Sequence, residues 1–139
     1  MDRKTENGLE VFGEIMGAER AAALRQSAGS GGFASAIGQL AIEFAFADVW
    51  GRPGMERSKK SLIVLAILIA TRQTLELKNH VRIGVANGLG VRDFEELLIQ
   101  CVPYLGFPAV ASATTAVLET LRELGMETQT KTSEERGLL

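Results

Sequence analysis

The feature that most limits how this chain can fold is an apolar run of nine residues from Leu62 to Ala70. A helix needs about 20 apolar residues to cross a bilayer, so this run is too short to be a transmembrane segment. A helix over residues 60–71 would be apolar nearly all round. Such helices are buried within a domain or at a subunit interface. The run therefore predicts a buried helix and argues against a membrane protein.

Helical spacing of apolar residues continues through the rest of the chain. Leu9, Phe12 and Met16, for example, fall on one helix face, and no segment shows the strict alternation that is typical of a strand. Glycine and proline interrupt helices, and they separate the segments. We therefore predict an all-α fold of about six to seven helices. One ends near residue 17, and the others span residues 18–28, 33–50, 60–71, 74–87, 92–104 and 108–124.

Composition fits a single globular domain and excludes several kinds of site. The chain has 139 residues, 46% of them hydrophobic, and its net charge of −2 argues against a nucleic-acid partner. A single cysteine excludes an intrachain disulfide, and a single histidine excludes multi-histidine zinc sites. The charged N-terminus lacks the apolar stretch of a signal peptide, so we expect a cytoplasmic protein. We predict one domain over residues 1–125 and a flexible tail over residues 126–139.

The single histidine, His80, lies one helical turn after Glu76 in the fifth predicted helix. Residues spaced i, i+4 share a helix face, so the carboxylate can hold one ring nitrogen of the imidazole. An imidazole with a pKa near 6.5 can give or take a proton at neutral pH. From the residues alone, the pair is either a proton-transfer pair in a half-buried pocket or an ordinary surface or packing contact.

Three further side chains could carry chemistry. Arg52 lies in a tight Gly-Arg-Pro-Gly connection, where a guanidinium suits a carboxylate ligand or an ion pair with Asp48 or Glu56. Tyr104 either presents its phenol to a cavity or is an ordinary buried aromatic residue. Cys101 shares the apolar stripe of its helix, so we predict a small buried hydrophobe rather than a nucleophile.

Four segments, taken in order, resemble one protein family. They read VWGRPGME at 49–56, ELKNHVR at 76–82, ANGL at 86–89 and YLGFPA at 104–109. This combination resembles the carboxymuconolactone decarboxylase family, in its short single-domain branch, and the resemblance covers the core at residues 33–124. The related alkylhydroperoxidase D-like branch has a Cys-x-x-Cys pair just before the histidine. Residues 73–76 contain no cysteine here, which sets the peroxide-reducing role aside.

The resemblance implies an alkylhydroperoxidase D-like all-α fold and an obligate homo-oligomer, often a hexamer built as a trimer of dimers. It also implies decarboxylation of a carboxylated muconolactone in aromatic-compound catabolism, without a cofactor or a metal ion. His80 matches the helix histidine of the family, and Glu76 matches the acid one turn before it. Arg52 and Trp50 match the arginine and tryptophan of the turn, and the resemblance implies that both bind substrate.

Three positions depart from the family pattern. Asp48 stands where a glutamate usually precedes the turn, and Ala111 replaces the amide that often enters the last helix. Pro103 would reshape the end of its helix beside the expected pocket. We keep Asp48 and Tyr104 among the expected substrate-binding residues. A site built to hydrogen-bond its substrate is selective about each partner, so these departures bear on the substrate more than on the fold.

The resulting hypothesis is a decarboxylase in which His80 stabilises an enolate or protonates carbon, while Arg52 orients an acidic substrate. One alternative keeps the fold but catalyses a non-decarboxylating isomerisation, cyclisation or dehydration in a biosynthetic pathway. A second alternative is a non-catalytic oligomeric protein that binds small molecules or serves as a scaffold. Only decarboxylation loses CO2, so the mass of the product separates the two enzymes, and a scaffold shows no turnover.

Overall fold

The computed structural model describes residues 2–139, which form seven α-helices and one π-helix and contain no strand. The elements are α1 (Arg3–Met16), α2 (Ala18–Gly29), α3 (Ser35–Leu40), η1 (Ala41–Trp50), α4 (Arg57–Ala70), α5 (Thr74–Ala86), α6 (Val91–Leu105) and α7 (Phe107–Glu123). The predicted all-α fold is confirmed. None of the described helices combines the length and the apolar character that crossing a membrane requires.

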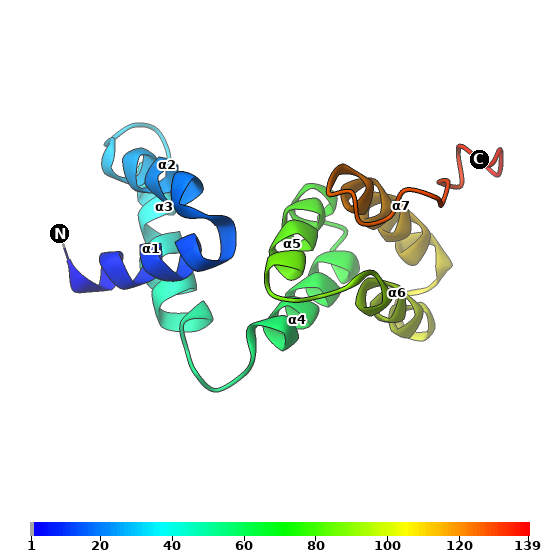
Figure 1. Cartoon of the computed structure of the whole chain (residues 1–139), viewed down its shortest axis with the longest axis horizontal. Coiled ribbons are helices and arrows are strands. Elements are labelled where there is room, and N and C mark those ends of the chain that lie inside the picture. The colour runs from blue at the N-terminus through cyan, green and yellow to red at the C-terminus, as the bar shows by residue number, and fades with distance from the viewer. Residues whose placement is uncertain (1) are drawn as a thin grey trace. The chain divides into compact units, whose positions relative to one another are not determined.

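The chain divides into two compact units. The first, Met1–Arg57, contains α1, α2, α3 and η1, and the second, Ser58–Leu139, contains α4 to α7. In Figure 1 the helices of the first unit are blue to cyan-green and those of the second run from green to brown. One domain over residues 1–125, followed by a flexible tail, stays a prediction.

In the first unit, α1 packs against η1 so closely that their backbones meet at Gly8. A Cβ atom on Gly8 would overlap the carbonyl oxygen of Ile42 and lie 2.8 Å from its carbonyl carbon. Only glycine, which has no Cβ, permits this approach. Further along the same pair of helices, the rings of Phe12 and Phe46 pack edge to face with centroids 4.9 Å apart, a preferred aromatic geometry.

A polar cluster also joins α1 to the two helical segments that follow α2. The buried hydroxyl of Thr5 donates a hydrogen bond to the Glu43 carboxylate at 3.0 Å. The side-chain amide of Gln39 donates to Thr5 at 3.0 Å and to Glu43 at 2.6 Å. Because buried polar groups are costly unless they are hydrogen-bonded, this cluster fixes the register between α1 and η1.

The prediction of one α-helix over residues 33–50 is correct in placing a helix there but wrong in its hydrogen-bond pattern. The α-helix α3 ends at Leu40, and the ten residues of η1 continue as a π-helix. The register is visible at the end of η1, where the N–H of Gly51 donates to the carbonyl of Phe46, five residues earlier, at 2.9 Å. Most π-helices are single turns, often at functional sites, so a π-helix of this length is unusual.

The second unit is built around one apolar core, to which α4, α5, α6 and α7 all contribute. Both α5 and α6 pack along α7. The apolar helix α4 buries Leu65 and Ile69, whereas Ile63 and Ile67 on its other face are 49% and 54% exposed in the single chain. The buried members of the core are Leu65, Ile69, Leu77, Val81, Leu89, Phe94, Cys101, Val110, Ala113, Ala116, Val117 and Leu121.

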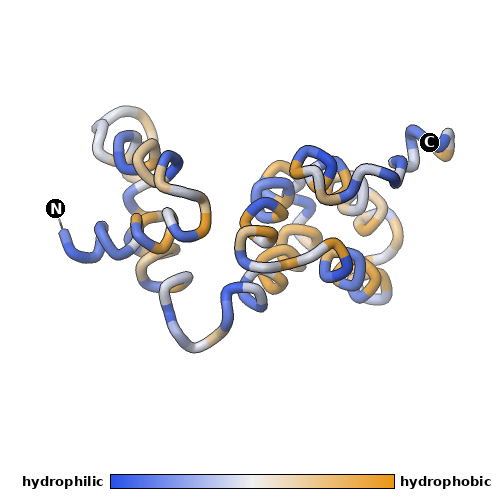
Figure 2. The backbone as a smooth tube through the Cα atoms, viewed as in Figure 1, coloured by the Kyte–Doolittle hydropathy of each residue, from blue (hydrophilic) through white to orange (hydrophobic). Residues whose placement is uncertain are grey.

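After α7 the chain continues as turns that are mostly hydrophilic (Figure 2). Arg122, near the end of α7, forms an ion pair with Glu135 at 2.7 Å and donates a hydrogen bond to the carbonyl of Thr130 at 2.5 Å. Thr132 and Glu135 exchange two hydrogen bonds of 2.9 and 3.1 Å. The hydrogen bond from Arg122 is the largest of the causes that lower the pKa of Glu135 to about 2. Arg122 therefore joins these turns to α7 through two polar contacts.

Candidate functional site

The helix α5 carries His80 and is fixed at both ends and along one face. It begins after Gln73, whose backbone is not helical, and the chain leaves it through Gly88 at a φ of +100°. Glycine adopts this left-handed conformation without strain. Leu77 and Val81, spaced i, i+4, are buried in the core of the second unit. The apolar face of α5 thereby sets the direction in which His80 projects.

His80 is half-buried, and its Nδ1 atom is shielded from solvent. Burial lowers the pKa of His80 below its usual value of 6.5, because an imidazolium loses hydration when it is buried. The negative charge of Glu76 raises the pKa, but this effect is the smaller of the two. The two side chains therefore interact electrostatically, and burial favours the neutral form of the imidazole.

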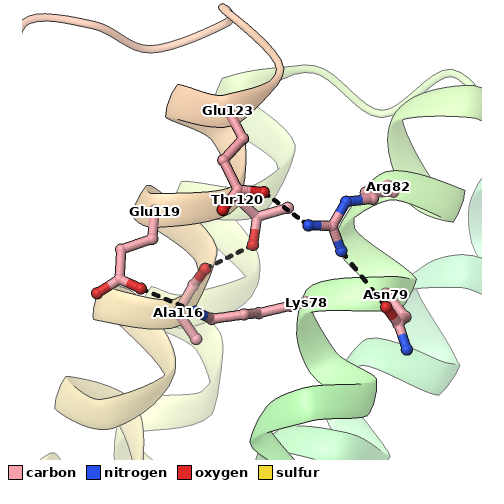
Figure 3. A network of polar contacts seen from close by, with 7 residues as sticks. All are labelled: Lys78, Asn79, Arg82, Ala116, Glu119, Thr120 and Glu123. Atoms are coloured by element: carbon pink, nitrogen blue, oxygen red, sulfur yellow. Dashed lines mark hydrogen bonds and ion pairs between the residues drawn. The ribbon is translucent and has the colours of Figure 1, made fainter.

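Two ion pairs join α5 to α7 on either side of the turn that carries His80 (Figure 3). Lys78 pairs with Glu119 at 2.8 Å, and one turn further along both helices Arg82 pairs with Glu123 at 2.6 Å. A second nitrogen of Arg82 also donates to the side chain of Asn79 at 3.4 Å. Because the two pairs repeat at the spacing of one helical turn, they oppose a shift of α5 along α7.

A part-buried hydrogen bond joins the C-terminal end of α5 to α4 as well. The side-chain amide of Asn87 donates to the hydroxyl of Ser61 at 2.9 Å, and Ser61 is only 1% exposed. Sequence reasoning gave neither residue a role. The signal available was a serine at the edge of an otherwise apolar helix, because a hydroxyl in that position requires a partner.

In the first unit, η1 leads into the turn that contains Arg52. Trp50 is buried at 8% exposure, whereas Arg52 is exposed. The backbone N–H of Arg52 donates to the carbonyl of Val49 at 3.2 Å, which closes the turn. Asp48 forms an ion pair with Lys4 of α1 at 2.6 Å, and this contact is the largest cause of the raised pKa of Lys4. Asp48 is thus held by α1 within this unit.

The two remaining candidates lie on α6. Tyr104 is 80% exposed in the single chain, so it does not belong to the core of the second unit. Cys101 is buried in the core, and burial raises the pKa of its thiol. Since the thiolate is the reactive form, this confirms Cys101 as a small buried hydrophobe. Pro103 lies inside α6, and the helix continues for two more residues, to Leu105.

The described part of the chain brings together no group of three or more His, Cys, Asp or Glu side chains that could hold a metal ion. Within the second unit, the charge of Glu76 acts on the half-buried His80, and the roles of these two residues in proton transfer stay predictions. The roles of Arg52, Trp50, Asp48 and Tyr104 in substrate binding stay predictions.

Comparison with known proteins agrees with the resemblance seen in the sequence. The profile of the carboxymuconolactone decarboxylase family matches residues 35–119, which include all six candidate residues. A 4-carboxymuconolactone decarboxylase from Acinetobacter baylyi is 30% identical over 125 residues, which span 90% of this chain and 92% of the relative. A nitrosuccinic acid decarboxylase from Metarhizium robertsii is 28% identical over 123 residues, which span 88% of this chain and 84% of the relative. The family profile matches more than half of the chain, and the relative from Acinetobacter baylyi aligns with nine-tenths of it. This chain therefore belongs to the carboxymuconolactone decarboxylase family.

Proposed function

We propose that this protein is a cofactor-independent decarboxylase that acts on a carboxylated muconolactone or a similar enolisable lactone acid. Both relatives are named as decarboxylases, which supports a carboxy-lyase at the level of reaction type. The observation that carries the proposal is His80, a half-buried imidazole beside Glu76 on a helix within the family match. Its pKa is lowered by burial, as is typical of proton-transfer groups in enzyme sites.

The names of the two relatives suggest what their substrates share. A carboxymuconolactone places a carboxylate near a lactone carbonyl, and nitrosuccinic acid places one near a nitro group. When such a carboxylate leaves as CO2, the electron pair of the broken carbon–carbon bond moves onto the electron-withdrawing group. The lactone then forms an enolate, and the nitro compound forms a nitronate. An enzyme of this kind has to stabilise that negative charge and supply one proton to carbon.

His80 suits both tasks. Its N–H can donate a hydrogen bond to the developing enolate oxygen, and donors aimed at developing charge are commonly the largest catalytic contribution. Its imidazolium form can give a proton to carbon, after which water reprotonates the ring. Because burial lowers the pKa of His80, the imidazolium is a stronger acid than it would be in water. The charge of Glu76 opposes that effect and keeps part of the basicity of the ring.

The binding of the substrate carboxylates is assigned to Arg52, with Trp50, Asp48 and Tyr104 as further substrate-binding residues. A guanidinium suits a carboxylate because it offers parallel N–H donors. The ion pair between Asp48 and Lys4 supports a more specific role for Asp48, in which it holds the end of η1 while Arg52 contacts the substrate.

The oligomer is proposed to be a hexamer formed from three dimers. Exposed apolar side chains support this proposal, because large apolar patches on a protein surface usually mark an interface. On the first unit, Ile37, Leu40 and Phe44 are 64–69% exposed and recur at helical spacing. Native mass spectrometry is expected to give six times the chain mass of 15.0 kDa. A monomer at micromolar concentration would contradict the proposal.

The reaction is tested with 4-carboxymuconolactone and the purified protein in buffer that contains EDTA. Loss of CO2, followed by the mass of the product, is expected without an added cofactor. The variant His80→Gln should lower kcat on the order of 10²–10⁴-fold, since this is the usual contribution of a general acid. Leu75→Gln is the matched control, because Leu75 lies on the same helix, is 73% exposed and faces away from His80.

Four outcomes would contradict the proposal. A His80→Gln variant with full activity would exclude His80 from the reaction. A product of unchanged mass would favour an isomerase or cyclase, and a product lighter by one water would favour a dehydratase. If neither the wild-type protein nor the Leu75→Gln control turns over a panel of enolisable acids, the protein is a binding protein or a scaffold.

A further inference from the structure

A pocket lies on the C-terminal unit, at the turn between α4 and α5. Its volume is about 160 Å³, several times the volume of about 30 Å³ that one water molecule occupies in the liquid. Leu77, Ala109 and Ala113 supply part of an apolar lining, and α7 contributes the last two of these. Neither His80 nor Glu76 is among the lining residues, so this pocket is separate from the proton-transfer pair.

Polar groups reach this pocket from three positions. Arg72 comes from the turn, Thr74 from the first residue of α5, and Ser112 from α7. Arg72 is the one charged residue among the lining residues, and none of the ion pairs found between described residues involves it. The pocket thus combines one uncompensated positive charge and two hydroxyl groups with an apolar lining.

The backbone of Arg72 is in a conformation that arginine rarely adopts. The N–H of Arg72 donates to the carbonyl of Ile69 at 3.2 Å, and the N–H of Gln73 donates to the carbonyl of Leu68 at 3.0 Å. This pair of hydrogen bonds defines a Schellman motif, in which the position of Arg72 is usually glycine. Arg72 instead has a φ of +57°, in the left-handed region that is unfavourable for a residue with a Cβ. A strained residue of this kind is a reason to look for a function.

We propose that this pocket binds a short aliphatic monocarboxylate, with the carboxylate on Arg72 and the alkyl chain against the apolar lining. A guanidinium binds a carboxylate through charge-assisted hydrogen bonds, and Thr74 and Ser112 can donate further hydrogen bonds to it. Phosphate and sulfate fit less well, because they carry more charge and have no apolar part to place against Leu77 and Ala113. The site gives the protein a means to bind an organic acid away from His80.

The proposal is tested by saturation-transfer NMR and by titration calorimetry with butyrate on the full-length protein. Affinity is expected to be on the order of 1–10 mM, because a ligand of six heavy atoms gains little beyond the entropy that it loses. The uncharged isostere butyramide and inorganic phosphate should each bind at least tenfold more weakly. Equal binding of butyramide, tighter binding of phosphate, or no butyrate binding up to about 50 mM (roughly fivefold above the upper end of that range) would overturn the proposal.

Three arginine variants locate the bound butyrate. Arg72→Gln should weaken binding at least tenfold, since it removes hydrogen bonds to a charged group. Arg92→Gln is the matched control, because Arg92 is exposed on α6 and does not line the pocket. This variant should bind butyrate with the affinity of the wild-type protein. Arg52→Gln should also keep the affinity. If Arg52→Gln abolishes binding and Arg72→Gln does not, the acid binds at the other arginine and the proposal is wrong.

A fourth variant, Arg72→Gly, tests the effect of Arg72 on stability separately from its effect on ligand binding. Glycine relieves the left-handed backbone, so Tm should rise by about 2–4 °C while butyrate binding is lost. A fall in Tm would mean that Arg72 stabilises the turn itself, and it would overturn the assignment of Arg72 to a ligand.

Discussion

Replacement of Gly8 with alanine tests how closely α1 is held against η1. The new Cβ would overlap the carbonyl oxygen of Ile42 and lie 2.8 Å from its carbonyl carbon, closer than real Cβ atoms come. Both atoms belong to the backbone, so no side-chain rotation relieves the overlap. The two helices must move apart by a distance on the order of 1 Å, as happens in overpacked cores.

The size of the effect follows from two opposing contributions. Overpacking of a core costs about 1–3 kcal/mol, and a clash between backbones belongs at the upper end of that range. Alanine is better than glycine inside a helix by about 1 kcal/mol. The expected net loss in the free energy of unfolding is therefore about 2 kcal/mol, which corresponds to a fall in Tm of roughly 6 °C.

Gly13→Ala is the matched control on the same helix. A Cβ on Gly13 would lie 3.5 Å from the Cβ of Ala21, an ordinary contact, so this variant should gain about 0.5–1 kcal/mol. Urea unfolding is followed by the fluorescence of Trp50, which is the single tryptophan and is buried in the first unit. If Gly8→Ala is as stable as Gly13→Ala, the close approach of α1 and η1 is refuted.

The remaining predictions concern the second unit. Because the pKa of His80 is lowered by folding, the unfolded chain binds more protons just below pH 6.5, and stability should fall as pH drops from 6.5 to the folded pKa. His80→Gln should remove this pH dependence of stability. The assay is the midpoint of urea unfolding between pH 5 and 8, about the range in which histidine titrates. If the midpoint of the variant changes with pH as much as that of the wild-type protein, the prediction is wrong. A double-mutant cycle on Arg82 and Glu123 should give a coupling of about 0.2–1 kcal/mol that shrinks in high salt, as for exposed ion pairs. A coupling that is insensitive to salt would show that the contact is not an ion pair.

Most of the helical fold could be predicted from the sequence, because the signals are local. Gly88 ends α5 as predicted, at a φ of +100°, and Pro108 lies in the first turn of α7. Cys101 is buried, as the apolar stripe of its helix indicated. These positions depend on backbone preferences and on helical spacing, which a single sequence displays directly.

The π-register of η1 could not be predicted, because it depends on contacts between segments that are distant in the sequence. Gly8 and Thr5 of α1 meet Ile42 and Glu43 more than thirty residues later. Apolar spacing cannot distinguish an α-helix from a π-helix over ten residues. The lowered pKa of His80 could not be predicted from the sequence either. Spacing indicated Glu76 as its partner, but not that burial changes the pKa of His80 more than the carboxylate does.

The π-helix also determines where the chain can change in length. Each hydrogen bond of a π-helix spans five residues and each one of an α-helix spans four. A deletion of one residue within η1 can therefore be absorbed by a return to α-helical hydrogen bonding. The same deletion in α5, before His80, would rotate that side chain by about 100° around the helix axis, because an α-helix has 3.6 residues per turn. We therefore expect a one-residue deletion to be tolerated in η1 and to remove the imidazole from its position when it falls in α5.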